Sequence, residues 1–285
     1  SMSLDSIYVD GFNRTTNDPK PGTARNPYQI RSVTQLQYIN WNYSQRTSRY
    51  SINSSNVGQA SNKTFPYLVY NYKTEETAAV KLNWKQSHDL DAYSEMGHDY
   101  ENNSNSLFTP IGSMYDVESV GKRDANPYAA FFDSSYDGQA YSIKNIEIRS
   151  ETQCIGLFGV TIGAKLKNVI LYSDKGNQII NLPTGRNWYA MGGLVGLAGT
   201  RNSTDSYFEN CTVSGYKIID QRSKGYEHLN NDNNNPYTPG WGGGCVGGLV
   251  GATNMNITHC TAVTDITLDI GYWIGYKNLR VGGVA

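Results

Sequence analysis

The chain of 285 residues lacks several features that mark common classes of protein. No apolar run reaches the roughly 18 residues that a membrane-spanning helix needs, and 24 basic against 25 acidic residues give a net charge of −1. Such a balanced charge disfavours nucleic acid as a partner. We therefore expect a chain that neither spans a membrane nor binds a polyanion.

Histidines, which are common metal ligands, are few and scattered along the chain. The four histidines stand in no zinc-ligand spacing. The segment that begins at Asp133 resembles an EF-hand, but its twelfth position, where calcium requires a bidentate Glu, is Lys144. We therefore predict no metal site and no cofactor. A calcium ion bound through the Asn-rich loops at 99–103 or 230–235 is the less favoured alternative.

Two short signatures recur along the second half of the chain. Met-Gly-Gly-Leu-Val-Gly at 191–196 returns as Val-Gly-Gly-Leu-Val-Gly at 246–251, with weaker copies at 155–159 and 281–284. The second signature is an apolar residue, any residue, Asn or His, an apolar residue, any residue and a last apolar residue. Its copies lie at 143–148, 166–171, 208–213 and 257–262.

The physics of these signatures indicates short strands that stack on copies of themselves. The last two apolar residues of the second signature face one side of a strand. Asn tolerates the left-handed backbone of a corner, and glycine lets neighbouring backbones approach closely. The sequence therefore predicts a mainly β fold, a right-handed single-stranded parallel β-helix with a strand and a short helix as its N-terminal cap.

The predicted domain organisation is simple. Residues 1–21 form a flexible segment and 22–285 a single β-helix domain, with a cap and irregular coils at 22–130 and regular coils at 131–285. Ser32 and Gln35 form a capping-box pattern, which predicts that a helix begins there and covers the open end. Because residue 285 falls inside a glycine signature, we expect the natural protein to continue.

Two of the four cysteines, Cys211 and Cys260, occupy one position of successive copies. They are expected to point inward about one strand spacing apart. Side chains that leave parallel strands in the same direction fit a disulfide poorly. Buried free thiols are therefore favoured over a disulfide.

The glycine copies followed by an Asn-containing strand resemble the GLUG-motif family of bacterial extracellular repeat proteins. Further likenesses follow in the family's order, at residues 22–30, 86–91, 108–112 and 136–145. The resemblance covers the chain from about residue 22 to its end. It implies a β-helical, adhesin-like protein on the bacterial cell surface, with no catalytic residues to carry over.

Aromatic residues gather in each long loop shortly before its glycine signature. If these loops emerge on one side, the rings would form a stripe able to bind sugar rings or peptide aromatics. The favoured alternative is that the rings pack against the coils and order the loops. The residues are Trp188, Tyr189, Tyr237, Trp241, Tyr272, Trp273 and Tyr276.

These observations favour a monomeric, non-catalytic module, secreted or on the cell surface, that binds a glycan or a host or cell-surface protein. One alternative is a polysaccharide lyase or glycoside hydrolase, and another is a structural spacer or pilus-type component. Such enzymes require converging carboxylates. The expected alignment puts Lys144, Lys167 and Glu209 in one position of successive copies, and it leaves Glu147 without an acidic counterpart.

Overall fold

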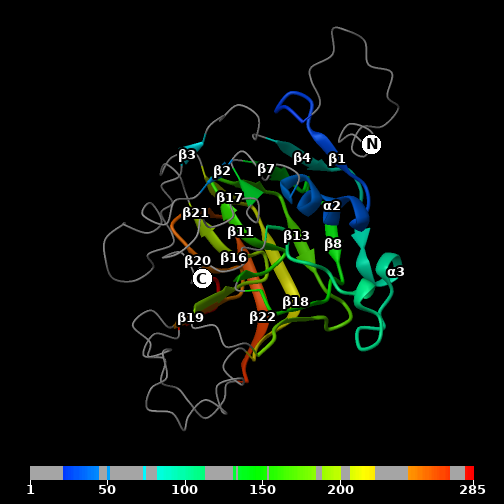
Figure 1. The fold of residues 1–285 in the computed structure, drawn as a ribbon, viewed down its shortest axis with the longest axis vertical. Coiled ribbons are helices and arrows are strands. Elements are labelled where there is room, and N and C mark those ends of the chain that lie inside the picture. The colour runs from blue at the N-terminus through cyan, green and yellow to red at the C-terminus, as the bar shows by residue number, and fades with distance from the viewer. Residues whose placement is uncertain are drawn as a thin grey trace.

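The computed structural model describes residues 22–44, 50–51, 73–74, 82–112, 131–132, 134–152, 154–183, 188–199, 206–221, 243–269 and 280–285. In this part of the chain the structure is mainly β, and its principal sheets are parallel (Figure 1). A separate antiparallel pair joins β2 (Tyr50–Ser51) to β3 (Lys73–Thr74).

Sheet 1 runs in chain order along the molecule. Its strands are β1 (Tyr28–Ile30), β4 (Asn83–Gln86), β7 (Ser135–Asp137), β12 (Lys165–Lys167), β17 (Tyr207–Glu209) and β21 (Asn256–Thr258). One core-facing position is occupied in register by Tyr28, Trp84, Tyr136, Leu166, Phe208 and Ile257. A single column of large apolar side chains therefore runs through the core.

Three further parallel sheets complete the core. Sheet 2 contains β5 (Leu90–Asp91), β8 (Ser142–Lys144), β9 (Ile148–Ser150), β13 (Ile170–Tyr172), β14 (Gln178–Asn181), β18 (Thr212–Asp220) and β22 (Thr261–Leu268). Sheet 3 contains β10 (Cys154–Ile155), β15 (Trp188–Met191), β19 (Gly243–Gly247) and β23 (Arg280–Gly282). Sheet 4 contains β6 (Phe131–Phe132), β11 (Phe158–Ile162), β16 (Val195–Gly199) and β20 (Val250–Thr253).

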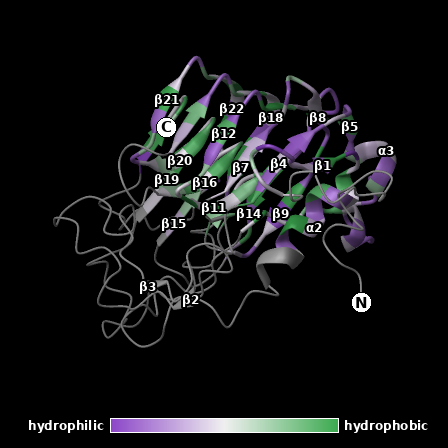
Figure 2. Cartoon of the chain, turned by 90° about the horizontal axis from the view of Figure 1, so that it is seen from above, coloured by the Kyte–Doolittle hydropathy of each residue, from purple (hydrophilic) through white to green (hydrophobic). Residues whose placement is uncertain are grey.

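The chain visits these sheets in a fixed order. From β7 onward it passes through sheets 1, 2, 3 and 4 and then returns to sheet 1. Each return adds a strand parallel to the strand of the previous pass. The strands lie in parallel rows (Figure 2), and buried and more exposed residues alternate along strands of sheet 1 such as β12 and β17, whereas β11 and β16 of sheet 4 are buried along their whole length. The alternation turns one face of strands such as β12 and β17 toward the core.

The corners between sheets 1 and 2 confirm the expected left-handed backbone. Asn168, Asn210 and His259 have φ of 56°, 53° and 53°. Asn210 Nδ2 donates to Asn168 Oδ1 at 2.9 Å, and Asn168 Nδ2 donates to Asp137 Oδ1 at 3.1 Å. Asn therefore supplies both the turn and a hydrogen bond to the corner of the previous pass.

The glycine signatures stack residue on residue, as the repeat predicted. Met191 pairs with Val246, and Val246 pairs with Val281. A Cβ on Gly193 would lie 2.6 Å from the Gly248 carbonyl oxygen. The signature therefore requires glycine because the neighbouring backbone occupies the space of a side chain.

The first expected copy of the second signature was placed wrongly. Ile143 pairs with Leu171 in sheet 2, and Tyr136 takes the sheet 1 position instead. Residues 143–148 fit the signature because Asn145 also has a positive φ, of 60°, but this Asn lies between β8 and β9, within sheet 2. Lys144 consequently lies beside Tyr172 and does not share the position of Lys167.

The predicted helix is confirmed as α2 (Val33–Ser44), which lies against β1 (Figure 1). Ser32 Oγ accepts a hydrogen bond from the Gln35 N–H at 3.1 Å, while Gln35 Oε1 accepts from the Arg31 N–H at 2.6 Å. Val33, Leu36 and Ile39 are buried in the core. None of the helices in the described part is long and apolar enough to cross a membrane.

Candidate functional site

Of the seven residues of the predicted aromatic stripe, the structure describes the side chain of one, Tyr189. Tyr189 is 2% exposed, and its hydroxyl donates to Asp220 Oδ2 at 2.5 Å. Tyr189 is therefore a core residue, and its assignment to a surface stripe is corrected. Trp188 begins β15, but its side chain lies outside the described residues, as do Tyr237, Trp241, Tyr272, Trp273 and Tyr276.

Two buried carboxylates are held in hydrogen-bond networks that sequence reasoning did not identify. Asp220 also accepts from Asn181 Nδ2 at 2.8 Å. Glu147 accepts from the Gln178 N–H at 2.8 Å and from Arg149 Nη2 at 2.9 Å. Burial of a charge is tolerated when such partners are present.

Arg149 links this network to the loop after α3 (Ala92–Met96). Its Nη1 lies 2.7 Å from Glu101 Oε1, and its guanidinium lies over the Tyr100 ring, 5.7 Å from the centroid. Tyr100 in turn accepts a hydrogen bond from Asn177 Nδ2 at 2.9 Å, and burial raises its pKa. The cluster therefore fastens a long loop to sheet 2.

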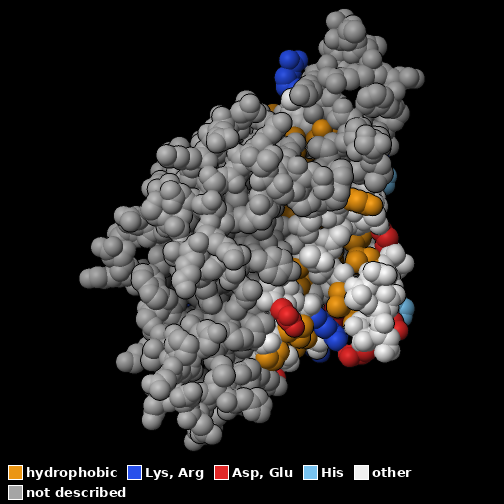
Figure 3. All heavy atoms as spheres, in the orientation of Figure 1, with side chains coloured by type: hydrophobic (Ala, Val, Ile, Leu, Met, Phe, Trp, Pro, Cys, Tyr) orange, Lys and Arg blue, Asp and Glu red, His pale blue; other side chains and the backbone are white. Residues whose placement is uncertain are grey.

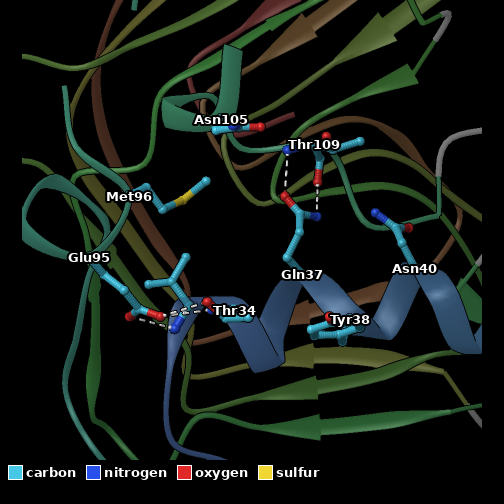
Figure 4. A pocket seen from close by; sticks show the side chains of 9 residues that line it. Thr34, Gln37, Tyr38, Asn40, Glu95, Met96, Asn105 and Thr109 are labelled. Carbon is cyan, nitrogen blue, oxygen red and sulfur yellow. Dashed lines mark hydrogen bonds between the residues drawn. The ribbon is translucent and has the colours of Figure 1, made fainter. Parts of the chain in front are cut away.

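A cavity of about 530 Å³ opens between α2, α3 and the short 3₁₀ helix η1 (Ser104–Ser106) (Figure 4). The residues around it on which its chemistry depends are Thr34, Gln37, Tyr38, Glu95, Met96 and Asn105. We call this cavity the cap pocket. No local pattern in the sequence indicates this pocket, because its walls come from segments about 60 to 70 residues apart.

Two amide side chains of α2 form one wall of the cap pocket. Gln37 donates to the Thr109 carbonyl at 2.8 Å and accepts from the Thr109 N–H at 2.7 Å. Asn40 likewise donates to the Pro110 carbonyl at 2.9 Å and accepts from the Gly112 N–H at 2.7 Å. Because positions i and i+3 share a helix face, both amides reach the 109–112 segment, and each forms one hydrogen bond as donor and one as acceptor with its backbone.

Glu95 joins the opposite wall to the start of α2. Its carboxylate accepts from the backbone N–H groups of Val33 at 2.8 Å and Thr34 at 2.9 Å. These donors are among those that a helix leaves unpaired at its N-terminus, where the helix dipole also favours a negative charge. Glu95 is therefore fixed in place by the helix start.

The candidate calcium loop at 99–103 is organised by its own side chains. Asp99 Oδ1 accepts from the Asn102 N–H at 3.3 Å, and Asn103 Oδ1 accepts from the Asn105 N–H at 3.1 Å. Within the described ranges, no three His, Cys, Asp or Glu side chains form a group that would hold a metal ion. The second candidate loop, 230–235, lies outside those ranges.

The four cysteines are free thiols, as favoured for Cys211 and Cys260. Cys211 is buried and Cys260 is half-buried, and the Cys211 N–H lies 3.4 Å from Cys260 Sγ. Interaction with the neighbouring thiol raises the pKa of Cys211 and lowers that of Cys260 to about 6. Burial raises the pKa of Cys245 to about 12.

Comparisons with known proteins add little to this geometry. No family model matches the chain, and no curated protein matches it. A crystal structure described as a candidate immunoglobulin A1 protease from Bacteroides ovatus aligns with 93% of this chain and 85% of that chain, at 14% identity and a TM-score of 0.29. A likeness at that TM-score supports no inference about fold or activity.

Proposed function

We propose that the chain is a GLUG-type, right-handed parallel β-helix that acts as a non-catalytic, adhesin-like module on the bacterial cell surface or in secreted form. Support for the architecture comes from the fixed order in which the chain visits four sheets and returns in parallel. Stacked passes bury an apolar side that no single pass could bury alone. The ligand is a glycan or a protein on a host or other cell.

The observation that carries the non-catalytic assignment is that the buried carboxylates are engaged in hydrogen bonds within the fold. Glu147 and Asp220 are both held by hydrogen bonds from neighbouring groups of the fold. Hydrolysis of glycosidic bonds requires a pair of carboxylates on either side of the scissile bond. In the cap pocket, Glu95 is the one carboxylate among the described lining residues, and it binds the helix start. This arrangement favours binding over catalysis.

The charges on the described surface near α3 are mixed in sign, which favours short-range contacts over long-range electrostatic attraction. Acidic and basic side chains are interspersed near α3 and the loop after it (Figure 3). Lys167 and Asp137 approach within 3.8 Å on neighbouring strands of sheet 1. Fields of mixed sign give little long-range attraction to a highly charged partner.

The test is a glycan array probed with the purified chain, together with a panel of extracellular host proteins, with calcium present and then chelated. We expect saturable binding that weakens when Trp188, Trp241 and Trp273 are each changed to alanine. Tyr172→Ala, on the exposed face of β13, is the control. Release of reducing ends from a polysaccharide would overturn the proposal in favour of an enzyme, and absence of binding on both panels would favour a spacer.

A further inference from the structure

The cap pocket carries polar groups whose hydrogen-bonding capacity is incompletely used. Gln37 Nε2 and Asn40 Nδ2 each donate one hydrogen bond to the 109–112 segment, which leaves each amide a second N–H. The Asn105 side-chain amide and the Tyr38 hydroxyl have no hydrogen-bond partner among the described residues. Several planar donors and acceptors therefore surround one space.

The same space has an apolar side. The Met96 side chain extends into the cavity from α3, while Tyr38 lies along α2 on its other side (Figure 4). Both side chains are half-buried and pack against the core. A ligand that suits this pocket must present an apolar face as well as several hydroxyl or amide groups.

The charge of the pocket restricts the ligand further. Glu95 is the charged side chain among its described lining residues, and no Lys, Arg or His is among them. An anionic ligand would meet a carboxylate without a compensating cation, which is unfavourable at short range. Sugars that carry carboxylate, sulfate or phosphate groups are therefore disfavoured.

We propose that the cap pocket binds a neutral pyranose unit of a glycan. Tyr38 and Met96 contact the C–H face of the ring, because rigid aromatic surface offers apolar contact at low entropic cost. The amides of Asn105 and Gln37 bind its hydroxyl groups. A volume of about 530 Å³ is within the range of small-molecule sites. This inference rests on the proposed function and assigns it a site separate from the aromatic loops.

The experiment titrates neutral sugars against the whole chain by ligand-observed NMR and calorimetry. The probes are glucose, galactose, mannose, N-acetylglucosamine and their disaccharides, with glucuronic acid as the anionic comparison. We expect Asn105→Ala to weaken binding of the preferred neutral sugar by about tenfold, the worth of one or two hydrogen bonds. Asn102→Ala, in the same loop but bonded to Asp99, should leave the affinity unchanged.

Two variants of Tyr38 separate binding from folding. Tyr38→Phe keeps the ring and should retain most of the affinity, whereas Tyr38→Ala should abolish measurable binding, with thermal unfolding used to verify that each variant is folded. Equal loss in both variants would overturn the stacking role of the ring. Preference for glucuronic acid over glucose would overturn the assignment of a neutral ligand.

The outcomes also distinguish this inference from the proposed function. Glycan binding that survives Asn105→Ala and Tyr38→Ala but is lost in the tryptophan variants would overturn the cap pocket while leaving the adhesin-like function in place. Binding to host proteins without binding to any neutral sugar would have the same meaning. If the full chain bound neither the sugars nor the proteins, both the cap-pocket site and the adhesin-like function would be overturned.

Discussion

The first and last strands of the parallel sheets differ in how far they bury their apolar side chains. At the β1 end, α2 covers the sheet, and Tyr28, Ile30 and Val33 are buried. At the other end, no strand of the described residues pairs beyond β21, β22 or β23. Val263 on β22 is 65% exposed there, and Val281 on β23 is 47% exposed. We call these the capped end and the open end.

Positions that pair in register show what causes the difference. Phe208 is fully buried, whereas Ile257, its partner on the open end, is half-buried. Val213 and Ala262 form a second such pair. Because each pair occupies one position of the repeat, its local backbone and pattern are equivalent. Burial at these positions is therefore provided by the next strand that pairs in parallel.

The largest expected effect comes from removing a large, fully buried side chain from the column of sheet 1. Phe208→Ala should lower the free energy of unfolding by about 3 to 5 kcal/mol, because a fully buried ring leaves a cavity. Ile257→Ala should cost about 1 kcal/mol, because its side chain is already partly solvated. Urea unfolding followed by tyrosine and tryptophan fluorescence measures both changes.

Equal losses in these two variants would contradict the comparison between interior and open end. Hydrogen exchange offers an independent check on the unmodified chain. Backbone amides of β21 and β22 should exchange faster than those of β17 and β18, since terminal passes of a repeat open more easily.

A smaller effect should follow from adding one methyl group to the glycine signature. A Cβ on Gly193 would lie 2.5 Å from Val213 Cγ1 and 2.6 Å from the Gly248 carbonyl oxygen, so Gly193→Ala should destabilise by about 2 to 3 kcal/mol. Gly283→Ala is the matched control at the open end, where a Cβ meets no atom within 4 Å. Its stability should change by no more than about 0.5 kcal/mol.

The thiol pair spans the boundary between interior and open end, and its reactivity tests that boundary chemically. The lowered pKa of Cys260 favours its thiolate near neutral pH, and the thiolate is the reactive form. Cys211→Ala removes the neighbouring thiol whose interaction lowers the pKa of Cys260, so that pKa should rise and alkylation of Cys260 by iodoacetamide at pH 7 should slow about tenfold.

Peptide mapping by mass spectrometry follows that reaction at Cys260 alone. Cys245→Ala is the control, since Cys245 is buried and its pKa is raised, so its removal should leave the rate at Cys260 unchanged. An unaltered rate in Cys211→Ala would show that the neighbouring thiol does not set the reactivity of Cys260.

The repeated part of the fold could be predicted from sequence because each signature has a local physical cause. Asn168, Asn210 and His259 mark corners because few residues adopt positive φ. Gly193 and Gly248 mark close backbone contacts. The earlier copy was misplaced because Asn145, also at positive φ, lies in a corner within sheet 2, and spacing alone does not reveal which sheet Ile143 joins.

The candidate sites were less accessible to sequence reasoning. Tyr189 and Asp220 are 31 residues apart, and their hydrogen bond depends on how β15 meets β18. The cap pocket depends on Glu95 and Thr109 reaching α2 from segments about 60 to 70 residues away. Side chains that meet through the stacking of whole passes leave no local spacing to recognise.

The capped end provides the smallest of these expected effects and completes the comparison. Ser32 Oγ accepts a hydrogen bond from the Gln35 N–H, so Ser32→Ala removes this cap at the start of α2 and should cost about 1 kcal/mol. Because α2 rests on β1, the loss should speed hydrogen exchange in β1 and leave β21 and β22 unaffected. The same change in exchange in β1 and in β21 and β22 would mean that the parallel strands open as one unit. The greater exposure of side chains at the open end would then not reflect a lower local stability.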